Sequence, residues 1–482
     1  MLNKRRLTIL LFINIIIIST ITVEYLYFMI NRDFILKFIE AQLIGIFFYS
    51  VLSTYSLVKN WLDIYIMFLA LIFLFLLTRP FMHLFDLVEM INYNEHDWFR
   101  IRDNFMFSNF TMNKVNFILI YMLLFLNIGY LIGLKKYFRP FSLKNLKLQY
   151  TKYLNPQMGY IFFIIGLFAF LIKVFLYIKL LNNFGYFYLY SGNYTLPIFV
   201  RVFDDFFYIG YVIIMINIPN KEKAYIISLI FILLYSTMLF TGMRGEFFTL
   251  VFTVIYLLSF LYQWRVKLWQ IISVGMSLMI LAQFTIVIKF SNVSFENIDL
   301  FDMINLFLYS QGVSILILGY FIEFSDYFVN IYSGFRYLIS TFISTGYTLF
   351  GQYGNRYEMS PETIYSVSDK LQYFTSPDGY YNGAGTGSSF IAEIYGLGGD
   401  IFFVAIGSFL LTYLIAYISR KMIYQKYGFF IFLIILPILF WIARAGYIYP
   451  IKKYFFALIL LFGFIFIYNL VFSKIRKVEG RK

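Results

Sequence analysis

The segment 241–246, with the sequence TGMRGE, places a helix-capping residue, an arginine and a glutamate between two apolar runs. Thr241 can cap the helix that follows it, and the first N–H groups of a helix attract anions. Arg244 adds a planar set of donors that suits a phosphate group, and Glu246 adds a carboxylate. The segment is therefore a candidate diphosphate-binding turn. The alternative is that Arg244 only anchors the end of the helix at the membrane surface.

A second polar segment, residues 383–389, is rich in glycine and precedes another apolar run. It matches neither the dinucleotide fingerprint nor the P-loop, so we expect a junction into a helix capped by Ser388 or Ser389. Glu393 follows one turn later. Its carboxylate is a candidate general base or the partner of an arginine, and a purely structural salt bridge is the competing interpretation.

Further cationic side chains could bind a diphosphate or a glycan, either at the ends of apolar runs or in a long polar segment. These candidates are Arg444, Arg336, Arg356, Lys289 and Lys173. Asp205, like Glu246, is a candidate base or arginine partner. The chain has no cysteine and two histidines, and its outer segments contain no Asp-x-Asp motif, so we expect neither a metal ion nor a cofactor.

These ionisable groups share one depth, because they cluster where apolar runs begin or end on the same predicted side. The other halves of the apolar runs are nearly free of charge. A charge relay through a membrane would need ionisable groups along its whole depth. The distribution instead indicates a site that opens to one side only.

The elements that hold these groups are predicted to be transmembrane helices. Of the 482 residues, 61% are hydrophobic and 13% are charged, whereas a soluble domain has about 25% charged residues. The apolar runs are continuous and long enough for helices, which excludes a barrel of short alternating strands. We predict an all-α, polytopic membrane protein that forms a single domain over 1–482, with about 12 spans (11 to 14). The predicted spans are 7–29, 41–58, 61–78, 115–134, 158–181, 199–218, 224–240, 246–262, 269–288, 396–418, 428–443 and 454–472.

The distribution of basic residues predicts the orientation of the chain. With the N-terminus in the cytoplasm, more than half of the 39 basic residues fall in inner segments, and nearly all acidic residues fall outside. Both termini are then cytoplasmic. The net charge of +14 follows from this topology, so no nucleic-acid partner is needed.

Two long outer loops follow from this orientation, 79–114 and 289–388. The larger loop contains two apolar stretches, 303–322 and 337–350. We expect them to form re-entrant or interfacial helices, or a further pair of spans. A loop of this length usually has a function.

With these features in place, the chain resembles a known family. The Thr-Gly-x-Arg-Gly turn at 241–245, a long outer loop, and Gly-x-Gly-Ser-Ser-Phe-Ile-Ala-Glu-Ile-Tyr-x-x-x-Gly at 385–399 are similar to the Wzy-type O-antigen polysaccharide polymerases. The architecture matches over nearly the whole chain, and the motifs match in these two segments.

The resemblance implies a glycosyltransferase in the bacterial cytoplasmic (inner) membrane with an extracytoplasmic active site. Its substrates would be oligosaccharide repeat units carried on undecaprenyl diphosphate. The growing O-antigen or capsule-like chain would pass from its carrier to the next unit, and the carrier diphosphate would leave. Arg244 matches an arginine position of the family, and a chain-length regulator protein is an expected partner. The related ligases use a histidine in the large outer loop, and 289–388 contains none.

Three other classes of membrane protein remain as alternatives. A lipid-linked oligosaccharide flippase usually has two related halves and short loops, unlike this chain. A glycosyltransferase that adds one sugar tends to carry its acids in the first outer loop, where this chain has only Asp33 and Glu40. A membrane O-acyltransferase would need a histidine inside the membrane.

Overall fold

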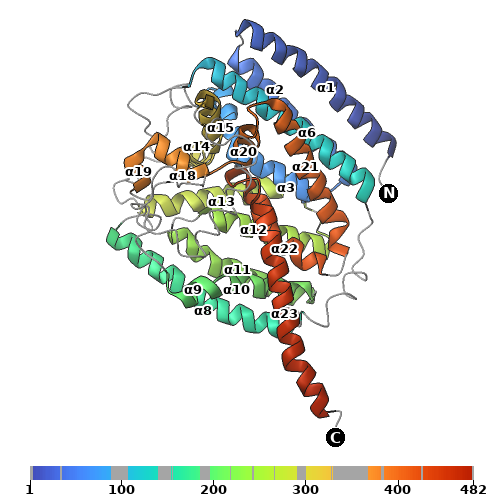
Figure 1. Ribbon diagram of the computed structural model, residues 1–482, viewed down its shortest axis with the longest axis vertical. Coiled ribbons are helices and arrows are strands. Elements are labelled where there is room, and N and C mark those ends of the chain that lie inside the picture. Colours follow the sequence, from blue (N-terminus) through green and yellow to red (C-terminus); the bar gives the residue numbers. More distant parts are fainter. Residues whose placement is uncertain are drawn as a thin grey trace.

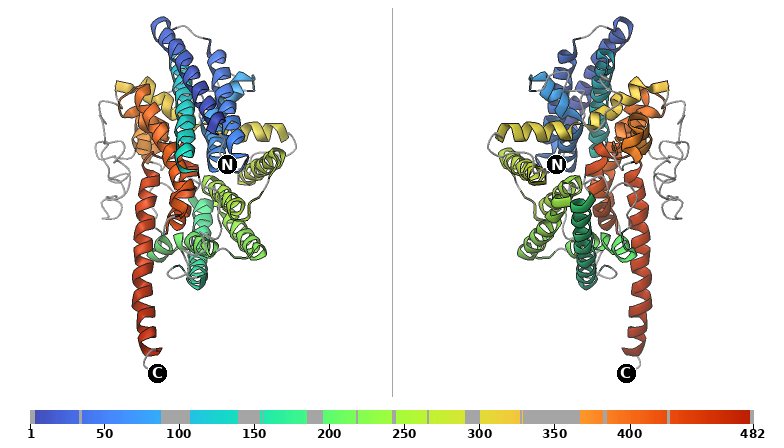
Figure 2. Two further views of the ribbon diagram at one scale, coloured as in Figure 1. Left: turned by 90° about the vertical axis from the view of Figure 1, so that its right-hand side faces the viewer. Right: turned by 90° about the vertical axis from the view of Figure 1, so that its left-hand side faces the viewer.

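The computed structural model consists of helices and connecting turns in the part of the chain that it describes (Figure 1). Helices α1, α2 and α6 lie side by side, and α23 extends beyond the rest of the bundle toward the C-terminus (Figures 1 and 2). The described residues are 4–32, 35–87, 107–138, 154, 156–184, 196–217, 219–241, 244–264, 266–289, 300–326, 328, 367–381, 385–424 and 427–479.

The helices of the N-terminal half are α1 (Lys4–Asn31), α2 (Leu36–Val58), α3 (Ile64–Ile72), the π-helix η1 (Phe73–Leu77), α4 (Thr78–Leu84), α6 (Asn109–Tyr137), α8 (Pro156–Phe184), α9 (Ile198–Phe203), α10 (Asp205–Ile216) and α11 (Lys221–Tyr235). Those of the C-terminal half are η3 (Ser236–Thr241), α12 (Arg244–Tyr262), α13 (Leu268–Lys289), α14 (Leu300–Gln311), α15 (Ser314–Glu323), α18 (Val367–Thr375), α19 (Pro377–Tyr381), α20 (Phe390–Gly396), α21 (Ile401–Arg420), η7 (Met422–Tyr424), α22 (Gly428–Trp441), η8 (Ile442–Arg444) and α23 (Tyr449–Glu479).

Eight of the described helices are long and apolar enough to cross a membrane, which confirms an α-helical membrane protein. All twelve predicted segments are helical, but four do not meet this test. The predicted span 199–218 is broken at Asp204 into α9 and α10, and α22 is short. The count of about 12 therefore stays a prediction.

The third predicted span is longer than its apolar run indicated. Helices α3, η1 and α4 form one continuous span, Ile64–Leu84. Arg79 and His83 therefore belong to a helix and not to the loop predicted from residue 79. Most of that loop, and its outer placement, lie outside the described residues.

The apolar stretch predicted at 303–322 forms two helices, α14 and α15, which meet at an angle of 41°. This geometry fits either a broken span or a re-entrant loop, as the sequence suggested. The second stretch, 337–350, lies outside the described residues.

Close helix packing in this bundle depends on glycine. Among the described elements, α6 and α21 make the most extensive contact. A Cβ on Gly129 would lie 2.3 Å from the carbonyl oxygen of Phe409, and one on Gly133 would lie 2.5 Å from the Ala416 side chain. This Gly-x-x-x-Gly spacing is typical of membrane helices whose backbones approach closely.

We expect Gly129→Ala to lower the free energy of unfolding by about 1–3 kcal/mol, because the new methyl group overpacks this contact. Gly45→Ala in α2 is the matched control, since nothing lies within 4 Å of a Cβ at that position. Thermal unfolding in detergent measures both variants. Equal melting temperatures would contradict the role of Gly129.

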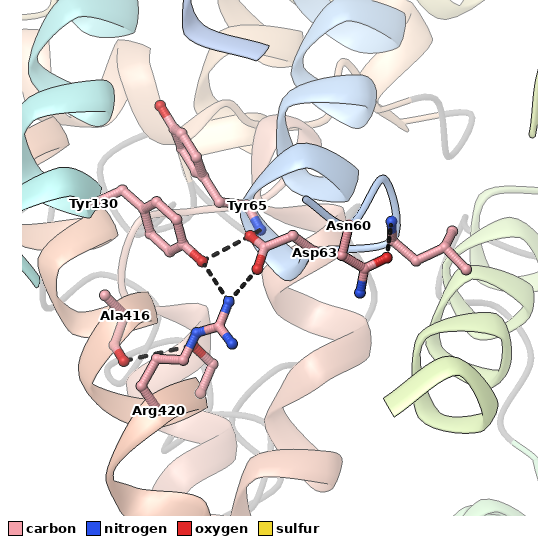
Figure 3. A network of polar contacts seen from close by, with 8 residues as sticks. Asn60, Asp63, Tyr65, Tyr130, Ala416 and Arg420 are labelled. Atoms are coloured by element: carbon pink, nitrogen blue, oxygen red, sulfur yellow. Dashed lines mark hydrogen bonds and ion pairs between the residues drawn. The ribbon is translucent and has the colours of Figure 1, made fainter. Parts of the chain in front are cut away.

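A buried ionic network ties α3, α6 and α21 together (Figure 3). Asp63 caps α3 by accepting from the N–H of Tyr65. Its carboxylate also accepts from the Tyr130 hydroxyl at 2.7 Å and forms an ion pair with Arg420. Because Asp63 is 3% exposed, removing either charge leaves the other poorly solvated.

We therefore expect Asp63→Asn to destabilise the protein by about 3 kcal/mol. The double variant Asp63→Asn/Arg420→Met should recover much of that loss, because no unpaired guanidinium remains. Thermal unfolding in detergent tests this order of stability. A double variant less stable than Asp63→Asn would show that Arg420 stabilises the fold without its partner.

Candidate functional site

The segment 441–447 connects α22 to α23 and brings together the two motifs that the sequence singled out. A Cβ on Gly245 would lie 1.9 Å from the Trp441 ring, so the start of α12 packs directly on this segment. From the other motif, Glu393 contacts Gly446 and Tyr447. We call this segment the 441–447 turn. It contacts the start of α12 through Trp441 and Glu393 of α20 through Gly446 and Tyr447.

Glu393 is a buried carboxylate that contacts the 441–447 turn. Its side chain belongs to the first turn of α20, and the residue is 3% exposed. The Ser388 hydroxyl donates to Oε1 at 2.7 Å, and the Tyr447 N–H donates to Oε2 at 2.8 Å. Burial raises the pKa of Glu393 from its ordinary value near 4.5 to about 7, although both hydrogen bonds oppose that shift. A carboxylate with such a pKa can accept a proton near neutral pH.

Two glycines allow this arrangement. Gly387 adopts a φ of +75°, which turns the chain so that Ser388 precedes α20 and reaches Glu393. A Cβ on Gly446 would lie 2.6 Å from Glu393 Oε1. Only a glycine there lets the carboxylate approach the backbone of the 441–447 turn.

Arg444 is the cation of the 441–447 turn. Its Nη1 donates to Gln311 Oε1 at 3.1 Å, and its guanidinium lies 5.4 Å from the ring centroids of both Phe75 and Trp441. Cation–π contacts with two rings and a hydrogen bond to an amide fix the direction of the guanidinium. A fixed guanidinium is suited to binding a phosphate oxygen.

Arg244 is the first residue of α12, next to Gly245. The structure describes its backbone but not its side chain. Gly245, the next residue, packs on the Trp441 ring, and the Arg444 guanidinium lies over the same ring. The start of α12 and Arg444 therefore share one tryptophan as a neighbour.

The chain matches the O-antigen polysaccharide polymerase Wzy family over residues 7–476, nearly its whole length. The chain belongs to this family. No curated protein and no solved structure matches significantly. The resemblance drawn from the two motifs is confirmed.

Family membership and the apolar helices make the chain a multi-pass membrane protein. The family is one of glycosyltransferase-type polymerases, which act on lipid-linked oligosaccharide repeat units of O-antigen. In this Wzy-family polymerase, the described residues contain no group of three or more side chains able to hold a metal ion. The 441–447 turn itself carries the Arg444 guanidinium and contacts the Glu393 carboxylate.

The other predicted site residues of the polymerase are ion-paired, exposed, or without a described side chain. Lys173 Nζ is 2.7 Å from Asp204 Oδ2, so a carboxylate already neutralises its charge. Asp205 is exposed. Glu246 is exposed in the first turn of α12, next to Gly245, and lies within electrostatic range of Lys173. The structure describes only the backbone of Lys289, the last residue of α13. Arg336 and Arg356 lie outside the described residues.

Three polar residues of the polymerase were not predicted as site residues. Arg79 in α4 is 1% exposed, and its guanidinium lies 4.2 Å from the Tyr309 ring centroid. One turn further, His83 Nδ1 lies 2.7 Å from Glu40 Oε2, and both side chains are buried. The sequence signal was available: Arg79 and His83 are four residues apart, so they share one face of any helix that continues past residue 78.

Proposed function

We propose that the protein joins undecaprenyl-diphosphate-linked oligosaccharide repeat units at the outer face of the bacterial cytoplasmic membrane. The observation that carries this proposal is the 441–447 turn, which holds a fixed arginine and contacts a buried carboxylate with a pKa near 7. Glycosyl transfer from a lipid diphosphate needs both groups. A cation stabilises the leaving diphosphate, and a base accepts the proton of the attacking hydroxyl.

In the proposed reaction, Arg444 and Arg244 bind the diphosphate of the donor. The ionised carboxylate of Glu393 accepts the proton of the acceptor hydroxyl. The acceptor oxygen then forms a bond to the anomeric carbon of the donor, and the bond from that carbon to the diphosphate oxygen breaks. Undecaprenyl diphosphate leaves with an added negative charge on its phosphate oxygens, which the arginines stabilise, and no metal ion takes part.

The remaining assignments concern the glycan and the membrane. Arg336, Arg356 and Lys289 are proposed to contact the donor or acceptor glycan. Both termini are proposed to lie in the cytoplasm, with 79–114 and 289–388 outside, as the distribution of basic residues indicates. A chain-length regulator is the proposed protein partner.

The native chain has no cysteine, so single cysteines can test the proposed orientation. Asp378→Cys in α19 should react in intact cells with a maleimide that cannot cross the membrane. Lys221→Cys, at the start of α11, should react only after permeabilisation. Both positions are exposed. The reverse result would overturn the proposal.

A deletion strain separates polymerisation from transport. Loss of a polymerase leaves surface lipid capped with a single repeat unit, whereas loss of a flippase leaves none. We expect single-unit caps, and we expect the wild-type gene to restore the glycan ladder. Complete absence of capped lipid would favour the flippase.

A further inference from the structure

Three helices that are distant in the sequence meet beneath the Arg444 guanidinium. Phe75 comes from the π-helix η1, Gln311 comes from the end of α14, and Trp441 begins the 441–447 turn. Phe75 and Gln311 must stay fixed for Arg444 to keep its direction. The contacts that fix Gln311 therefore act on the proposed diphosphate site without touching the substrate.

Gln311 is the last residue of α14, immediately before the bend between α14 and α15. The bend is packed against α4, because a Cβ on Gly312 would lie 2.4 Å from Thr78 Oγ1 and 2.8 Å from Arg79 Cγ. Only glycine allows this approach. The position of Gln311 is thus set by the surface of α4 at residues 78 and 79.

Arg79 makes the polar contacts that hold this bend. Its Nε donates at 3.3 Å to the main-chain carbonyl of Tyr309, in the last turn of α14, where a helix no longer uses all its carbonyls. Its guanidinium also stacks on the Tyr309 ring at 4.2 Å. A single side chain therefore fixes both the backbone and a ring two residues before Gln311.

The π-helix links the two supports of Arg444. Residues 73–77 form η1, and α4 continues directly from it, so Phe75 and Arg79 belong to one continuous helix. Such π-helical turns are rare and occur often at functional sites. Phe75 supports the guanidinium of Arg444 directly, while Arg79 supports it through Tyr309 and Gln311.

We propose that Arg79 is a positioning residue, which orients Arg444 toward the substrate diphosphate by holding the α14–α15 bend. This inference rests on the proposed function, because it takes Arg444 as a diphosphate ligand. The contacts lead from Arg79 to Tyr309, then to Gln311, and from Gln311 to Arg444. Removing Arg79 or Gln311 should therefore weaken diphosphate binding only while Arg444 is present.

A double-mutant cycle tests this order, with undecaprenyl diphosphate as a competitive inhibitor of the full-length enzyme in proteoliposomes. We expect Arg79→Met to weaken inhibition about tenfold, in line with loss of one charge-assisted hydrogen bond at Arg444. In an Arg444→Gln background, the same change should have less than about a twofold effect, because coupled residues are not additive. Arg201→Met, at an exposed arginine of α9, is the control and should leave inhibition unchanged.

Gln311→Leu is a second variant, which removes the acceptor of Arg444 and leaves Arg79 in place. It should reproduce the tenfold loss, and it keeps the test decisive if Arg79→Met does not fold. A full tenfold effect of either change in the Arg444→Gln background would overturn the inference, since a merely structural residue acts independently of Arg444. If Arg444→Gln alone left inhibition unchanged, the proposed diphosphate site itself would be wrong.

Discussion

Glu393→Gln is expected to lower the rate of polymerisation by about 10²–10⁴-fold, because the acceptor hydroxyl loses its base. In the wild-type enzyme the carboxylate must be ionised to accept a proton. Its pKa of about 7 therefore predicts a rate that rises with pH, with a midpoint near 7. The variant should lose this dependence. The measurement is the initial rate of chain extension in proteoliposomes from pH 5.5 to 9.

Stability distinguishes a base from a structural carboxylate. The folded state holds the Glu393 proton more tightly than the unfolded chain, so this group stabilises the fold below its ordinary pKa. That contribution is lost as the pH rises through about 7. Glutamine never ionises, and its amide can still accept from Tyr447 and donate to Ser388. Glu393→Gln should therefore melt no lower than wild type at pH 8. A large fall in melting temperature would indicate a structural role.

Ser388→Ala provides a matched control at the same carboxylate. The Ser388 hydroxyl lowers the pKa of Glu393, so its removal should move the midpoint of the rate profile to higher pH. Activity should return at pH 9. If Ser388→Ala abolished activity at every pH, its hydroxyl would be needed for more than this hydrogen bond.

The sequence predicted the broad fold because long apolar runs identify membrane helices directly. The sequence could not predict where a helix ends when polar residues extend it beyond its apolar run. The apolar run stops at Arg79-Pro80, which suggested a loop. The helix, which includes the π-helix just before Arg79, instead continues to Leu84. Arg79 packs on the Tyr309 ring and His83 pairs with Glu40, so both polar side chains can be buried within this helix.

The candidate site was predicted only in part for a related reason. Glu393 was chosen as a carboxylate one turn beyond a predicted serine cap, but Ser389, at the N-cap position, makes no capping hydrogen bond with its side chain. The second partner of Glu393, the N–H of Tyr447, is 54 residues away, and no local pattern predicts that contact. The same holds for Arg444, whose acceptor Gln311 lies in a segment that the sequence left open between re-entrant or interfacial helices and a further pair of spans.

Arg444→Gln is expected to lower polymerisation by about 10²–10³-fold, as for the loss of one fixed donor to a developing anion. In cells, the glycan ladder should collapse to lipid capped with a single repeat unit at normal protein level. Arg444→Lys keeps the charge but not the planar donor fork held between Phe75 and Trp441. We expect lysine to restore only part of the rate.

Lys452→Gln is the control for this loss, because Lys452 lies just beyond the 441–447 turn and its ammonium stacks on Tyr449. It should change the rate less than about threefold, as expected for a cation outside the reaction. Arg244→Ala should behave like Arg444→Gln, since Gly245, the neighbour of Arg244, packs on the tryptophan that Arg444 also contacts. If both arginine variants retained normal ladders, the leaving diphosphate would have to be stabilised by other cations, and the 441–447 turn would not be the catalytic centre.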